Sequence, residues 1–93
     1  MKFVWDDEKA ATNWHKHGIT FPAAARVFLD PFHAPVQDRH VDGEERWQTT
    51  GQIDGLGIVV VAHTWPEDDG VEMIRIISAR RAQPHERRAY ENG

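Results

Sequence analysis

The chain has 93 residues and a formal charge of −4, and this length predicts one small domain spanning residues 1–93. The negative charge argues against a globally basic nucleic-acid binder, although a local basic patch is compatible with it. The absence of cysteine excludes disulfide bonds and thiolate metal sites. No apolar run reaches the length of a membrane span and no signal-peptide pattern opens the chain, so we expect a cytoplasmic protein.

The first third of the chain predicts a short strand over residues 2–5 and then two helices. Asp6 or Asp7 can cap the first helix, which Gly18 ends, and Thr20 can cap the second. Helical spacing groups the side chains into faces: Ala10, Trp14 and His17 on one face of the first helix, Lys9, Asn13 and Lys16 on its neighbouring face, and Ala24, Val27 and Phe28 on the apolar face of the second, which runs to about Leu29.

From residue 33 onwards the pattern becomes strand-like. Strands are expected over residues 33–39, 45–53, 57–65 and 71–79, with turns at 41–43, 54–55 and in the acidic segment 66–70. The segment GIVVVAHTW is almost entirely apolar and β-branched, which indicates a central strand covered on both faces. In the last strand, regular alternation predicts that Arg75 and Arg80 lie on opposite faces.

Together these elements predict an α+β fold. Hairpin-length connections favour a small antiparallel sheet of about four strands. We expect the two N-terminal helices to pack on one face of this sheet. A short C-terminal helix, PHERRAYE, follows the last strand.

Positive charge gathers near the C-terminus, where five arginines between Arg75 and Arg88 face a single acid, Glu86. Arg75 lies in the middle of an apolar strand, so it either pairs with a carboxylate such as Glu86 or serves a function. Arg80, at the end of a strand, is the better candidate for contacting a phosphate. Arg46 can join either arginine on the open face of the sheet, whereas Arg88 is expected on a solvated helix face.

The sequence His15-Lys16-His17 ends the first helix. The two histidines point about 200° apart on a helix and cannot chelate one ion together, so a zinc site is disfavoured. Cations in a last turn also complement the helix dipole; this role is open to all three residues and is the one expected for His15. Lys16 extends the face of Lys9 into a cationic strip, and His17 is expected to be partly buried. His63 is expected to be a core histidine, and the four tryptophans are expected in the core or an interface rather than as base-stacking platforms.

Three segments carry a family resemblance: FVWDDEKAATNWHKHGITFPAAARVFLDP, GEERWQTTG and IRIISARRAQPHERRAYE. In this order they resemble the BrnT toxins of BrnT/BrnA type II toxin–antitoxin modules. The resemblance implies a fold like that of the RelE ribonuclease toxins and cleavage of RNA that halts translation. It also implies an antitoxin encoded next door, a ribbon-helix-helix protein that binds the promoter of its own operon, so that the toxin meets promoter DNA only indirectly.

A ribonuclease that works without a metal or cofactor needs a base for the 2′-OH, cations for the phosphate and an acid for the leaving 5′-oxygen. Together with the resemblance, this requirement leads us to expect catalytic roles for His17, Lys16, Arg75, Arg80, Glu86 and Tyr90, with RNA or phosphate binding by Arg46, Lys9, Arg81 and Arg87. In this hypothesis His17 moves protons together with Glu86 or Tyr90.

Two other functions stay open. The acidity favours a non-catalytic subunit that binds the antitoxin and acts as co-repressor, because such a protein need not touch RNA itself. A metal-dependent hydrolase is the weaker alternative, since no spacing of histidines and carboxylates supports it.

Overall fold

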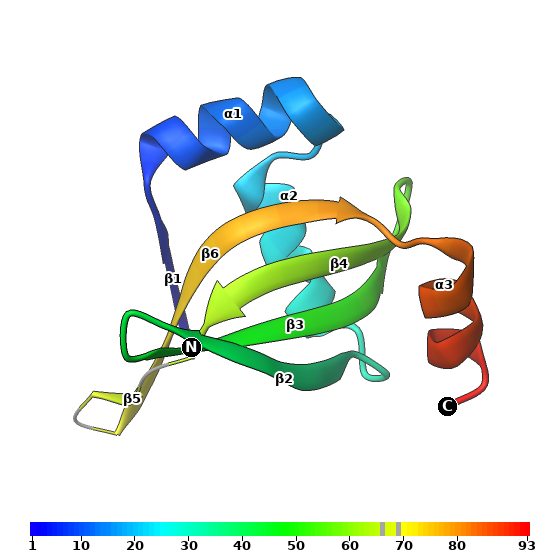
Figure 1. The fold of residues 1–93 in the computed structure, drawn as a ribbon. Helices are drawn as coiled ribbons and strands as arrows, with labels where there is room; N and C mark the ends of the chain where they lie inside the picture. Colours follow the sequence, from blue (N-terminus) through cyan, green and yellow to red (C-terminus); the bar gives the residue numbers. More distant parts are fainter. Residues whose placement is uncertain (66, 69) are drawn as a thin grey trace.

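The computed structural model describes residues 1–65, 67–68 and 70–93, with only the backbone of residues 67 and 68. In chain order the elements are β1 (Lys2–Trp5), α1 (Asp7–His17), α2 (Phe21–Ala25), the 3₁₀ helix η1 (Arg26–Leu29), β2 (Ala34–Val41), β3 (Glu44–Ile53), β4 (Gly57–Thr64), β5 (Glu67–Asp68), β6 (Val71–Arg81) and α3 (Pro84–Glu91) (Figure 1). None of the described helices is long and apolar enough to cross a membrane. The acidic turn predicted at 66–70 falls partly on residues outside the described ones.

The main sheet has the strand order β1-β6-β4-β3-β2, and the short β5 pairs with β6. The pairs β2–β3, β3–β4 and β4–β6 are antiparallel, which confirms the predicted α+β class and the antiparallel run. The sheet is larger than the predicted four strands because β1 joins it, parallel to β6. Since β1 and β6 lie about 70 residues apart along the chain, the local sequence pattern carries no sign of this pairing.

Helix α1 begins and ends as predicted. The carboxylate of Asp6 accepts hydrogen bonds from the backbone N–H groups of Glu8 and Lys9, at 2.8 and 3.2 Å. Gly18 ends the helix in the left-handed conformation, with φ of 67°. The face that Trp14 shares with Ala10 and His17 is only partly covered, and the side chain of Trp14 is 55% exposed, which excludes it from the core.

The buried residue of α1 is instead Asn13. Its amide nitrogen donates to the carbonyl oxygens of Ile19 and Ala79, each at 3.0 Å, and its oxygen accepts from the N–H of Ala79 at 2.9 Å. The amide of Asn13 thus replaces a neighbouring strand where β1, whose last paired residue is Trp5, no longer covers the edge of β6. Satisfying these buried backbone groups turns Asn13 inwards and Trp14 outwards.

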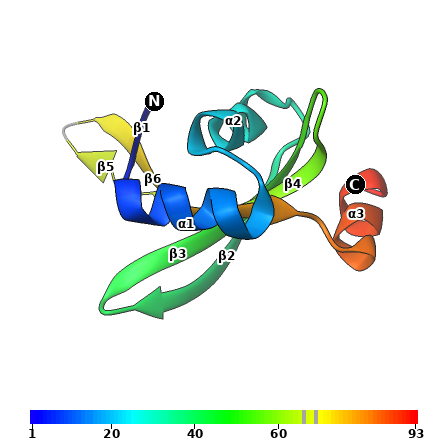
Figure 2. The same ribbon diagram turned by 90° about the horizontal axis from the view of Figure 1, so that it is seen from above.

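The second predicted helix is divided into α2 and η1, which pack on one face of the sheet (Figures 1 and 2). Its predicted apolar residues Ala24, Val27 and Phe28 are all buried, as predicted. Gly51 allows η1 to approach β3 closely, since a Cβ atom at this position would lie only 2.8 Å from Val27 Cγ1. The core therefore lies between α2–η1 and one face of the sheet, and the opposite face is left for other contacts.

A β-bulge in β6 changes which arginines share a face. Ser78 pairs with Ala62 in β4, but the next residue of β4, His63, pairs with Ile76, so that one residue of β6 is extra. The bulge reverses the alternation of side chains beyond it. Arg75 and Arg80 consequently lie on the same face of the sheet, and the prediction of opposite faces is wrong.

Candidate functional site

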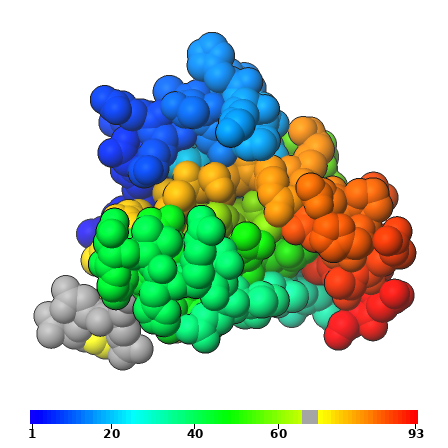
Figure 3. Space-filling model, in the orientation of Figure 1, coloured from blue at the N-terminus to red at the C-terminus, as the bar shows by residue number. Residues whose placement is uncertain are grey.

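Three of the predicted site residues, Arg46, Arg75 and Arg80, lie on the face of the sheet that α2 does not cover, which is the face turned towards the viewer in Figure 3. The pairing of strands shows this directly. Arg75 and Arg80 pair with Thr64 and Val60 of β4, and the same register aligns Gln48 of β3 with Ala62. Because side chains alternate along β3, Arg46 lies on the same face as Gln48. The expectation that Arg46 joins Arg75 and Arg80 on the open face is therefore confirmed by geometry.

A groove runs between α1 and β6, which lie side by side in both views (Figures 1 and 2). Its volume is about 560 Å³. The groove is lined by Glu8, Lys9, Thr12, Asn13, Lys16, His17, Ile77, Ser78 and Arg80. Four of the predicted site residues, Lys9, Lys16, His17 and Arg80, thus meet in one place although they come from opposite ends of the chain.

The two lysines of this groove are available to an anion. Both side chains are exposed, and neither Lys9 nor Lys16 forms an ion pair with another residue in the described part of the chain. His17 is half-buried at the end of the same helix, and histidine is the residue type that most often transfers protons in catalysis. The groove therefore combines unpaired cations with a group that can transfer a proton.

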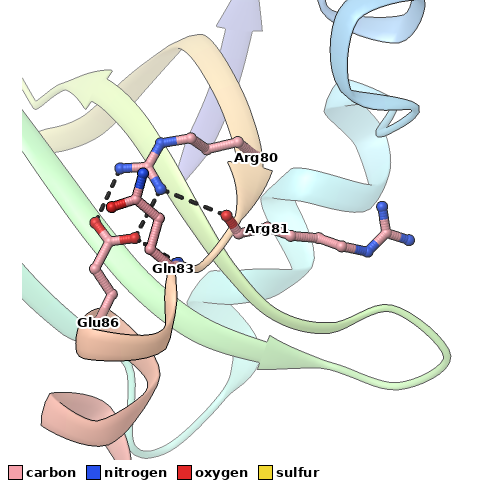
Figure 4. Close-up of polar contacts among 4 residues, drawn as sticks. All are labelled: Arg80, Arg81, Gln83 and Glu86. Carbon is pink, nitrogen blue, oxygen red and sulfur yellow. Dashed lines mark hydrogen bonds and ion pairs between the residues drawn. The ribbon is translucent and has the colours of Figure 1, made fainter.

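Arg80 is held in place by Glu86. Two parallel hydrogen bonds join the guanidinium to the carboxylate, at 2.7 and 2.9 Å (Figure 4). Glu86 also accepts from the backbone N–H of Gln83 at 2.8 Å, which helps to cap α3. The hydrogen bonds from Arg80 lower the pKa of Glu86 to about 2, and the same contact raises the pKa of Arg80. At neutral pH Glu86 is therefore the anionic partner of Arg80.

Arg75 also has a carboxylate partner, and this partner is Glu44 rather than Glu86. An Nη atom of Arg75 donates to Oε1 of Glu44, and Nε of Arg46 lies 3.8 Å from the same oxygen. That Nε atom is buried and has no hydrogen-bond partner among the described residues. The local sequence pattern gives no sign of this pairing, because Glu44 and Arg75 lie 31 positions apart.

Tyr90 lies away from the groove. Its hydroxyl donates to Asp30, which also accepts from the N–H groups of Gln52 at 2.8 Å and Phe32 at 2.9 Å. The hydrogen bond to Asp30 raises the pKa of Tyr90 to about 12. Burial opposes ionisation of Asp30, but its hydrogen bonds, that from Tyr90 foremost, lower its pKa overall. Asp30 thus ties α3 to the sheet, a role that no local sequence pattern indicates because its partners Gln52 and Tyr90 are distant in the chain.

Of the remaining residues singled out in the sequence, Arg81 and Arg87 lie near α3 and His63 lies in the core. Arg81, Arg87 and Tyr90 line a separate cavity of about 410 Å³ beside α3. His63 is fully buried, as expected for a core histidine. Its Nδ1–H donates to the carbonyl of Thr64 at 3.1 Å, so that Nε2 accepts from the hydroxyl of Thr49 at 2.7 Å. Burial lowers the pKa of His63, which keeps this imidazole neutral.

The fold and the groove define a small α+β protein with an arginine- and lysine-lined surface suited to a polyanion. A family model described as "Ribonuclease toxin, BrnT, of type II toxin-antitoxin system" matches residues 5–86. The chain belongs to this family, which confirms the resemblance seen in the sequence. Members are ribonuclease toxins that pair with an antitoxin. The matched range includes every residue of the groove, whereas Arg87 and Tyr90 lie beyond it.

A solved structure supports the same conclusion. The crystal structure of the Brucella abortus ribonuclease toxin, BrnT, has a TM-score of 0.63 and 30% sequence identity, and the similarity covers 89% of this chain and 97% of that one. A comparison with curated proteins finds no match. The predicted fold class is therefore confirmed both by the sheet itself and by a solved relative.

Proposed function

We propose that the chain is a metal-independent endoribonuclease that cleaves RNA at the groove between α1 and β6 and thereby inhibits translation. The observation that carries this proposal is the meeting of Lys9, Lys16, His17 and Arg80 in one groove. The ribonuclease toxin family of the chain supports the reaction type. Arginine and lysine suit a phosphate, and histidine suits the proton transfers that cleavage requires.

The proposed reaction is attack of an RNA 2′-OH on the adjacent phosphorus. A bond forms between the 2′-oxygen and phosphorus, the bond from phosphorus to the 5′-oxygen breaks, and a 2′,3′-cyclic phosphate remains. His17 accepts the proton of the 2′-OH, and Lys16 donates a proton to the leaving 5′-oxygen. Arg80, assisted by Lys9, stabilises the negative charge that grows on the phosphate oxygens.

The other predicted catalytic groups take different roles in this proposal. Glu86 has a pKa of about 2 and bonds to Arg80, so we assign it to holding Arg80 rather than to proton transfer. Tyr90 keeps its proton on the hydrogen bond to Asp30 and supports α3. Arg75 and Arg46 bind the RNA backbone along the open face of the sheet, and Arg81 and Arg87 bind it at the separate cavity beside α3.

The proposed antitoxin is a ribbon-helix-helix protein that neutralises the toxin. It binds the promoter DNA, and the toxin meets this DNA only through the antitoxin. A second candidate function, a non-catalytic subunit that binds the antitoxin and acts as co-repressor, rests on one observation. Both Arg75 and Arg80 already have carboxylate partners, and paired arginines are less available to RNA.

Incubation of the purified chain with a structured RNA in excess EDTA tests the proposal. Arg80→Ala and His17→Ala are the informative variants, and Arg88→Ala is the matched control, because Arg88 is exposed on α3 and outside the groove. We expect cleavage that persists in the chelator, is unchanged in Arg88→Ala and is lost in the other two variants. Intact RNA in every sample contradicts the enzymatic proposal and favours the non-catalytic subunit.

A further inference from the structure

Arg80 directs both of its Nη groups towards the carboxylate of Glu86. The two N–H···O bonds of 2.7 and 2.9 Å are the geometry that a guanidinium also uses to hold two oxygens of a phosphate. A planar fork cannot make both sets of bonds at once. The carboxylate of Glu86 therefore occupies the position in which the two Nη groups of Arg80 would bind a phosphate group.

Glu86 reaches this position from α3, a helix that packs lightly on the rest of the molecule. No residue of α3 is buried. The hydrogen-bonded side-chain contacts that tie the helix to other elements are those of Glu86 with Arg80 and of Tyr90 with Asp30. Figure 1 shows α3 at the end of the sheet, away from α1 and α2. Arg80 can therefore exchange partners without opening the core.

We propose that Glu86 is a built-in competitor of the substrate, a carboxylate that occupies the phosphate position on Arg80 until an RNA phosphate displaces it. This inference rests on the proposed function, since it concerns the regulation of the same site. An RNA backbone can displace Glu86 because it also engages Lys9 and Lys16, which a single carboxylate on Arg80 does not engage. Isolated anions lack that advantage, so the competitor favours a polyanion over small phosphates.

The substitution Glu86→Gln tests this exchange with little change in shape. Glutamine keeps an oxygen that can accept the hydrogen bond from the N–H of Gln83, but it removes the charge that holds Arg80. The matched control is Glu91→Gln, which removes one negative charge from an exposed position on the same helix. The probe is a 2′-O-methyl RNA oligonucleotide, which lacks the attacking hydroxyl, so that binding is measured without cleavage.

We expect Glu86→Gln to bind this probe about threefold to tenfold more tightly than the unmodified protein, with Glu91→Gln within about twofold. Arg80→Ala should weaken binding. In the double variant Arg80→Ala/Glu86→Gln the gain should disappear, because the two residues act on one position. Equal or weaker binding by Glu86→Gln, with Arg80→Ala still weakening binding, overturns the competitor and leaves the proposed function intact.

A second measurement uses the unmodified protein and does not depend on the variant folding normally. The carboxyl ¹³C signal of Glu86 in NMR should move when the 2′-O-methyl RNA is added, because the carboxylate loses its contact with Arg80. A signal that stays in place while the RNA binds contradicts the proposal. Failure of the unmodified protein both to bind the probe and to cleave RNA removes the proposed function, and the competitor falls with it.

Discussion

Arg75 and Arg80 lie on the same strand and the same face of the sheet, yet their surroundings differ. Arg80 borders a groove with Lys9, Lys16 and His17, and its carboxylate partner comes from a peripheral helix. Arg75 shares Glu44 with Arg46, and Glu44 is the first residue of β3, a strand that lies between β2 and β4 in the sheet. The comparison teaches that the residue type alone does not make a phosphate site. Neighbouring cations and a carboxylate partner on a peripheral helix distinguish Arg80.

Substitution of Asn13 should have the largest effect on the difference between the two arginines. Asn13 fixes α1 to β6 and so forms the groove that only Arg80 borders. Asn13→Ala leaves the backbone groups of Ala79 and the carbonyl of Ile19 without their buried partner. We expect a loss of about 3 kcal/mol in the free energy of unfolding, measured with urea. Thr12→Ala, an exposed neighbour on the same helix, is the control and should change stability little. Equal stability of the two variants would show that the Asn13 contacts are dispensable.

Cleavage rates in EDTA compare the two arginines directly. Arg80→Ala should lower the rate by about 100-fold, as expected when a group that stabilises transition-state charge is removed. Arg75→Ala should lower it by no more than about tenfold, because Arg75 acts only through backbone binding in the proposed mechanism. Similar losses in both variants would mean that the groove does not set Arg80 apart.

The pH dependence of the free energy of unfolding tests how much the Arg80–Glu86 ion pair stabilises the protein. Its pKa is lowered to about 2 in the folded protein, so the Arg80–Glu86 pair stabilises fully above the ordinary value near 4.5 and is lost as the pH falls through about 2. At pH 7, Glu86→Gln should be less stable than the unmodified protein by about 1–2 kcal/mol, a figure reduced for partial exposure of the pair. Urea unfolding between pH 7 and 2.5 should show this difference shrinking in acid. A constant difference would indicate that the charge of Glu86 is not responsible.

Tyr90→Phe should have the smallest effect. It removes the hydrogen bond to Asp30 and should cost about 1 kcal/mol at neutral pH, with cleavage unchanged within about twofold. Since the pKa of Tyr90 is raised to about 12, this stabilisation is present below pH 10 and lost as the pH rises towards 12. A large fall in cleavage, without a fall in stability, would return Tyr90 to the catalytic candidates.

Much of the local structure could be predicted from the sequence. The caps Asp6 and Thr20, the stop at Gly18 and the helix beginning at Pro84 all depend on neighbouring residues, and they occur where predicted. The buried residues of the second helix followed from spacing alone. The exposure of Trp14 could not be predicted, because helical spacing does not identify the polar contact, here that of Asn13, that decides which way the helix turns.

The candidate site also has residues that could be predicted from the sequence and residues that could not. Residue type and family resemblance were enough to select Lys9, Lys16, His17 and Arg80, which the structure brings together. The counter-ion Glu44 and the anchor Asp30 were missed, since each acts on a residue more than 20 positions away. No local pattern signals such a partner.

By itself, the sequence determined most of the elements, the caps of the helices, the family and the set of basic residues, because these depend on backbone preferences and on residue chemistry within a few positions. The tertiary structure alone decided the parallel pairing of β1 with β6, the bulge that puts Arg75 and Arg80 on one face, and the carboxylate that each arginine holds. These features arise from contacts between segments that are distant in the chain. Their geometry is set only when the sheet forms and its buried polar groups find partners.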